Sequence, residues 1–190
     1  KEEAKKKLAA LRVYVGYPAQ WKSYEGLEMR PDDLVGNMMR AERYDYDRTV
    51  RQLSEPPVDG EFAYPTQAVN AYYSSDAGDL VFLAGYLQPP NFDPLADDAT
   101  NYGALGSTIG HEISHAFDDK GRAVDEKGEL RDWWTEEDAA RFKAQSNILV
   151  EQYNQYEPLP GLFVNGELTL GENIADLAGA AIAYRAYIRS

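Results

Sequence analysis

Residues 109–118 read Ile-Gly-His-Glu-Ile-Ser-His-Ala-Phe-Asp and contain the only two histidines of the chain, His111 and His115. Four residues advance an α-helix by just over one turn, so both imidazoles project from one face and can converge on one ion. Glu112 projects from another face. Because neutral imidazole is a good zinc ligand, this stretch predicts a helix that carries a metal site.

A helical His-Glu-x-x-His is the signature of zinc metalloproteases, although two histidines also occur by chance on a polar helix face. A zinc site needs a third ligand, and Glu172 is the candidate. Glu172 and Asp176 share one face of a predicted helix, so one carboxylate can bind the metal while the other accepts a hydrogen bond from a ligand imidazole. Alternatively, Thr169 and Glu172 form a capping box at the start of that helix.

The residues after His115 narrow the class of zinc site. Metzincins need glycine at position 118 and histidine at position 121, where this chain has Asp118 and Gly121. Without cysteine or another histidine, the third ligand is a carboxylate or lies outside the chain. This favours a His2Glu site of the thermolysin type. The chain also lacks a Gly-x-Ser-x-Gly elbow and a phosphate-binding Gly-x-x-x-x-Gly-Lys loop.

The chain resembles the catalytic region of the neprilysin family of zinc metalloendopeptidases. The resemblance covers most of residues 60–190, and more loosely Gly16-Tyr17-Pro18 and Trp21. The matching blocks, in chain order, are Val69-Asn70-Ala71-Tyr72-Tyr73, Leu87-Gln88-Pro89-Pro90, Asn101-Tyr102-Gly103, residues 109–119, Gly121-Arg122, Asp132-Trp133-Trp134 and residues 170–176.

The resemblance implies a role for each candidate site residue. It makes zinc (Zn2+) the cofactor and the hydrolysis of internal peptide bonds in oligopeptides the reaction. It also implies that His111, His115 and Glu172 are the zinc ligands and that Glu112 is the general base. By the same resemblance Asp176 is the carboxylate behind a ligand histidine, and Asn70 and Ala71 are the pair that binds the substrate backbone.

The residues around Asn70 independently predict a hairpin. Residues 69–74 read as a strand, 76–79 as a turn and 80–83 as a return strand. A hairpin with a free edge accepts an extended peptide as an additional strand. Asn70 alone is equally compatible with the start of a strand or turn.

The expected fold is α+β and mainly α, a thermolysin-like zincin (gluzincin) catalytic core fragment with a small sheet and the His-Glu-x-x-His helix. Residues 1–55 are expected to form a helical segment leading to a missing N-terminal lobe, and residues 56–190 the zincin core, truncated at its C-terminal end. Within the first segment a helix over 32–53 is expected to end at Pro56-Pro57, with a stripe of apolar residues facing a core: Leu34, Val35, Met38, Met39, Val50 and Leu53.

The resemblance also implies partners beyond an oligopeptide substrate. Family members carry a further histidine and an arginine that act on the tetrahedral intermediate, beyond the point where this sequence stops. The remainder of a parent enzyme, an N-terminal lobe and a C-terminal segment, is therefore an expected partner. Two alternatives stay open: a non-catalytic, zinc-stabilised peptide-binding module, and one subunit of a split peptidase.

Composition excludes other classes. The net charge of −13 disfavours nucleic acid, whose phosphates need a basic surface. No apolar run is long enough to span a bilayer, and residues 1–7 lead into no signal sequence. The absence of cysteine favours a bacterial member of the family, and an extracytoplasmic location (periplasm, cell envelope or secreted) is expected.

Overall fold

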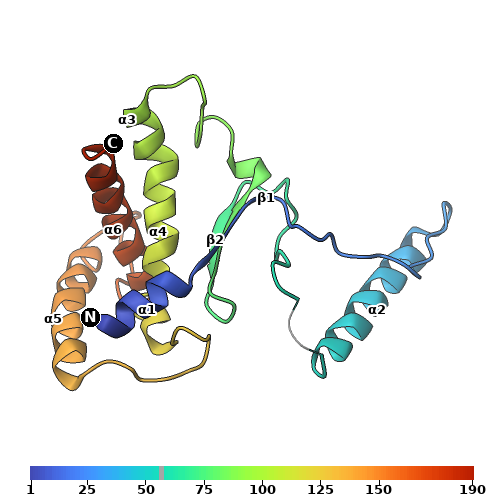
Figure 1. Cartoon of the computed structure of the whole chain (residues 1–190), viewed down its shortest axis with the longest axis horizontal. Helices are drawn as coiled ribbons and strands as arrows, with labels where there is room; N and C mark the ends of the chain where they lie inside the picture. Colours follow the sequence, from blue (N-terminus) through green and yellow to red (C-terminus); the bar gives the residue numbers. More distant parts are fainter. Residues whose placement is uncertain (56–57) are drawn as a thin grey trace. The chain divides into compact units, whose positions relative to one another are not determined.

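The computed structural model describes residues 1–55 and 58–190, which form two compact units (Figure 1). One unit comprises residues 1–17 together with 64–190, and the other comprises residues 18–63. The first 17 residues lie with the large unit because they contribute a strand to its sheet. The division predicted between residues 55 and 56 concerns the lobes of a larger protein and stays a prediction. The predicted stop at Pro56-Pro57 lies outside the described residues.

The sheet of the large unit has three strands in the order β1-β3-β2. Strand β1 (Arg12–Gly16) pairs in parallel with β3 (Asp79–Leu83), and β2 (Ala71–Ser74) pairs antiparallel with β3. Every residue of β3 is buried, as expected of a central strand. The predicted hairpin is confirmed, and β2 is an edge strand. The parallel pairing of β1 with β3 was not predicted from the sequence.

Six α-helices lie in the described residues, five of them in the large unit. These five are α1 (Glu2–Ala10), α3 (Asp98–Asn101), α4 (Ser107–His115), α5 (Glu136–Tyr153) and α6 (Leu170–Tyr187). Short 3-10 turns cover Ala84–Tyr86 and Gly121–Ala123. A π-helical segment at Tyr102–Gly106 joins α3 to α4, so the helical run that carries the histidines begins before α4 and is wound more loosely there. The mainly helical α+β architecture is as predicted.

Helices α4 and α6 lie side by side and cross in close contact (Figure 1). A Cβ atom on Gly110 of α4 would come within 2.9 Å of both the Cα and the carbonyl oxygen of Gly179 on α6. A Cβ atom on Gly179 would come within 2.5 Å of the carbonyl oxygen of Ser107. The two backbones therefore touch where neither helix has a side chain.

The opposite side of α4 packs against the sheet. Ala71, Leu80 and Phe82 form a buried apolar cluster, and Ile113 of α4 lies against it. Leu11, at the end of α1, packs on the same cluster. Helix α4 is thus held between the sheet and α6, and the faces that carry its histidines are fixed in direction.

The small unit contains α2 (Leu34–Gln52), which begins where Asp33 accepts a hydrogen bond from the Gly36 amide at 2.9 Å. The predicted core-facing stripe is wrong for this structure, because no residue of α2 is buried. The reason is that residues 18–55 and 58–63 supply no second helix or strand to cover it. The exposed members are Leu34, Val35, Met38, Met39, Val50 and Leu53. No helix in the described parts of the chain combines the length and hydropathy needed to cross a membrane.

The helix crossing makes a testable prediction about two glycines of one helical run. Gly110→Ala drives a methyl group into the α6 backbone and should lower the free energy of unfolding by about 1–3 kcal/mol. Gly103→Ala is the matched control, because a Cβ there meets nothing within 4 Å. It should leave stability unchanged or raise it by about 0.5–1 kcal/mol. Urea unfolding followed by circular dichroism measures both. Equal effects would contradict the backbone contact.

Candidate metal centre

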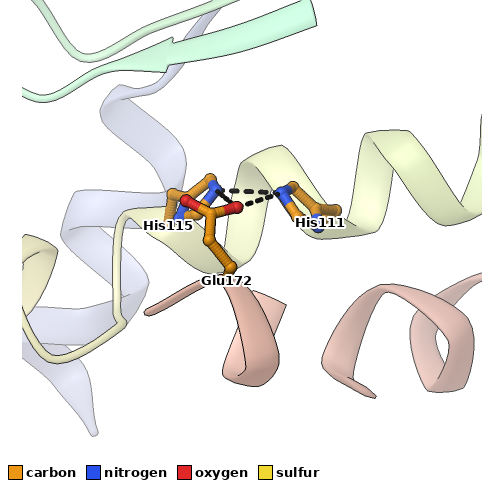
Figure 2. A group of neighbouring side chains, drawn as sticks. All are labelled: His111, His115 and Glu172. Carbon is orange, nitrogen blue, oxygen red and sulfur yellow. Dashed lines mark hydrogen bonds and ion pairs between the residues drawn. The ribbon is translucent and has the colours of Figure 1, made fainter. Parts of the chain in front are cut away.

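Helix α4 places His111 and His115 on one face, one turn apart, as the sequence predicted (Figure 2). Their Nε2 atoms point toward one another and are 2.9 Å apart. Both side chains are largely shielded from solvent, with 19% and 18% of their surface exposed. The two imidazoles therefore converge on a single point beside the helix.

Glu172 approaches the same point from the first turn of α6 (Figure 2). Its Oε2 atom lies 3.4 Å from Nε2 of His111 and 3.6 Å from Nε2 of His115. The capping-box alternative is not realised, because Thr169 makes no side-chain cap at the start of α6. Glu172 is instead directed at the histidine pair.

A carboxylate stands behind each imidazole. Nδ1 of His111 lies 2.8 Å from Asp176 Oδ1, and Nδ1 of His115 lies 2.8 Å from Asp118 Oδ2. An ionised carboxylate only accepts hydrogen bonds, so both Nδ1 atoms donate. The bond to Asp118 is the main reason that the pKa of His115 is raised, which makes this imidazole a stronger base and a better ligand.

Asp118 is the site residue that the sequence reasoning missed. It lies just beyond α4, is 5% exposed, and is held by the amides of Lys120 and Gly121 at 2.9 and 2.6 Å. Burial acts to raise its pKa, but the hydrogen bonds from His115 and the two amides outweigh burial and the pKa is lowered. The signal was available, since an aspartate three residues after the second histidine lies within reach of its ring.

The donor set fits a zinc ion. With both Nδ1 atoms donating, each Nε2 atom is an acceptor, and the Glu172 oxygen is a third acceptor. Three acceptors lie within 4.8 Å of one another, an arrangement that a cation satisfies. Ligands about 2.1 Å from one tetrahedral zinc ion are separated by about 3.4 Å, and the three observed separations bracket that value.

Glu112 lies on α4 between the two histidines and is buried, with 6% of its surface exposed. Burial raises the pKa of its carboxyl group, while the nearby histidines and a backbone hydrogen bond from Tyr73 act in the opposite direction. A carboxylate with a raised pKa beside a metal site is suited to accept and return a proton. Glu112 is thus placed between the metal site and strand β2.

The edge of β2 lies beside this carboxylate. The Leu83 amide donates to the Asn70 carbonyl at 3.2 Å, so these residues form a hydrogen-bonded antiparallel pair. Because such pairs alternate along a strand, Ala71 and Tyr73 direct their main-chain groups toward the free edge. Asn70 is partly exposed, and its side chain has no hydrogen-bond partner among the described residues.

A cavity of about 450 Å³ adjoins His115 and Glu172. Tyr73, Ser75 and Leu168 also contribute to its lining. The structure therefore brings together His111, His115, Glu172, Glu112 and Asp176, and it places Asn70 and Ala71 at the start of the neighbouring edge strand.

Known proteins are similar to this chain in sequence and in fold. The family model described as peptidase family M13 matches residues 70–190. Human neprilysin is 39% identical over 197 residues, which cover 98% of this chain and 26% of neprilysin. Human endothelin-converting enzyme 1 is 39% identical over 194 residues, covering 98% of this chain and 25% of that enzyme. The chain thus spans about a quarter of the length of these curated relatives.

Solved structures match equally well. The crystal structure of the Mycobacterium tuberculosis zinc metalloprotease Zmp1 in complex with an inhibitor superposes with a TM-score of 0.93 and 43% identity, over 100% of this chain and 30% of that one. PepO from Lactobacillus rhamnosis superposes with a TM-score of 0.92 and 36% identity, over 97% and 30% of the respective chains.

The carboxylates behind the imidazoles make a prediction about metal affinity. Asp118→Asn and Asp176→Asn should each raise the zinc dissociation constant about 10–100-fold, because each replaces the ionised carboxylate that orients a ligand ring with a neutral amide. Asp119→Asn removes the same charge one residue away without a hydrogen bond to either imidazole, and it should leave zinc affinity within about twofold of the original. Competition with a chromophoric chelator measures all three. Equal losses in all three variants would indicate a general charge effect instead.

Proposed function

The chain belongs to peptidase family M13, and from that premise we propose that it forms the zinc-binding catalytic core of an endopeptidase that cleaves internal bonds of oligopeptides. Membership confirms the resemblance to the neprilysin family of zinc metallopeptidases that the sequence indicated. The observation that carries the proposal is the convergence of three acceptor atoms beside a buried glutamate.

In the proposal His111, His115 and Glu172 hold the ion, and Asp176 and Asp118 fix the two imidazoles with Nε2 facing it. When bound, zinc supplies Lewis-acid activation of water and of the scissile carbonyl group. Glu112 accepts the proton of the attacking water and delivers it to the leaving nitrogen. Burial raises the pKa of Glu112, which strengthens the carboxylate as a base.

The substrate lies along β2 in this proposal. Ala71 presents its main-chain N–H and C=O groups at the free edge, where an extended peptide pairs as an additional strand. The partly exposed Asn70 amide offers a donor and an acceptor to the same backbone. Binding through the main chain suits an enzyme that accepts varied sequences, while the adjoining cavity takes a side chain.

The activity of a whole protein is part of the proposal, because the relatives are about four times as long as this chain. An extracytoplasmic location and a requirement for further lobes likewise remain predictions. The behaviour of Glu112 separates the peptide-binding module from the main proposal, and co-purification of a second polypeptide would identify a split peptidase.

Glu112→Gln keeps the shape of the side chain but removes the base. We expect turnover of an internally quenched peptide to fall by about 10²–10⁴-fold, with zinc content and peptide affinity retained. Glu167→Gln, at an exposed position, should not change turnover. The assays use the chain by itself and its full-length gene product, with zinc determined on the same samples. Unchanged turnover in Glu112→Gln would overturn the role of this residue.

Asn70→Ala tests the edge strand as the peptide site. Loss of the amide hydrogen bonds should lower kcat/KM about tenfold while zinc affinity stays the same. Gln67→Ala, an exposed amide outside the strand, should leave kcat/KM unchanged. If both variants behave alike, peptides bind elsewhere.

A further inference from the structure

Helix α1 carries one lysine that differs from its neighbours. Lys5 and Lys6 are exposed and pair with glutamates on the same helix. Lys7 is 2% exposed, and a buried ammonium group is costly unless its donors are satisfied. The proposed reaction gives Lys7 no part, so its burial needs another explanation.

The Lys7 ammonium group is bound by the loop that follows α4. Its Nζ atom donates to the carbonyl oxygens of Gly121 at 2.7 Å and Val124 at 2.6 Å. These partners are 114 and 117 residues away in the chain. A side chain of the N-terminal helix therefore fixes the backbone of the segment directly after the metal-binding helix.

That loop in turn holds the carboxylate behind His115. The Gly121 amide donates to Asp118 Oδ1 at 2.6 Å, and Asp118 Oδ2 lies 2.8 Å from His115 Nδ1. The loop also folds tightly against the end of α4, because a Cβ on Gly121 would be 1.8 Å from the His115 carbonyl oxygen. The Gly121 carbonyl oxygen thus accepts a hydrogen bond from Lys7, and the Gly121 amide donates one to Asp118.

The charges of Lys7 and of the nearby aspartates favour the same contacts. Burial lowers the pKa of Lys7, and the negative charges of Asp118 and Asp125 oppose that change. The positive charge of Lys7 and the negative charge of Asp118 therefore attract each other.

We infer that Lys7 is a positioning residue for the metal centre: through Gly121 and Asp118 it fixes the ring orientation of His115. The inference rests on the proposed zinc site and extends it to a residue of the first helix. His111, whose ring is held by Asp176 on α6, lies outside this chain of contacts.

Zinc affinity tests the inference through a double-mutant cycle. Lys7→Met retains the length of the side chain and should raise the zinc dissociation constant about tenfold, and Lys5→Met should leave it unchanged. In an Asp118→Ala background, which removes both acceptor oxygens, Lys7→Met should have no further effect on zinc affinity, because the contact it works through is already lost. Thermal unfolding of each variant sets a temperature at which all are folded. Additive losses in zinc affinity would overturn the inference.

A second readout needs no metal. In the metal-free chain, ¹⁵N-histidine NMR resolves two imidazoles, one for each histidine. Lys7→Met should shift the Nδ1 resonance of His115 and weaken protection of its proton, with His111 unchanged. Equal shifts at both rings, or none, would contradict the inference. Absence of zinc binding by the unsubstituted chain would refute the proposed function, yet this NMR comparison would still test the link from Lys7 to His115.

Discussion

The metal centre depends on the direct contact of two helix backbones at Gly110 and Gly179. There the backbones of α4 and α6 touch, which brings the side chains of one helix within reach of those of the other. Gly110 immediately precedes His111, and Gly179 follows Asp176 by less than one turn. The contact therefore fixes the position of α6 along the axis of α4. A side chain at either glycine would move the α6 carboxylates away from the imidazoles.

The two histidines are held by different means, although the bonds have the same length. Asp118 is local to His115 and is itself fixed by two backbone amides, whereas Asp176 reaches His111 from a separate helix. The His115 side of the centre therefore depends on the loop after α4, and the His111 side depends on the helix crossing. Each ring orientation is therefore set by a different part of the fold.

The sequence predicted what local spacing determines. The shared face of the two histidines and the hairpin follow from helical and strand periods. Glu172 was a candidate because a zinc site needs a third ligand and because of the family resemblance, and in the structure its carboxylate lies beside the histidine pair. The sequence did not predict the parallel pairing of β1 with β3, because no local pattern encodes a partner some 67 residues away. The burial of Lys7 was not predicted for the same reason, because its partners Gly121 and Val124 are 114 and 117 residues away in the chain. The stripe on α2 was misread because apolar spacing shows which face is apolar, not whether this chain supplies its cover.

Strand β2 links peptide binding to proton transfer under the proposed function. Ala71 and Tyr73 both face the free edge, but a backbone hydrogen bond from Tyr73 already goes to Glu112. The two residues are about 6.8 Å apart along the strand, one dipeptide repeat. A peptide that pairs with Ala71 therefore meets no free strand donor one repeat further along. Under the proposed function the peptide carbonyl group at that position would lie beside Glu112, and the zinc ion that His111, His115 and Glu172 would hold would supply its activation.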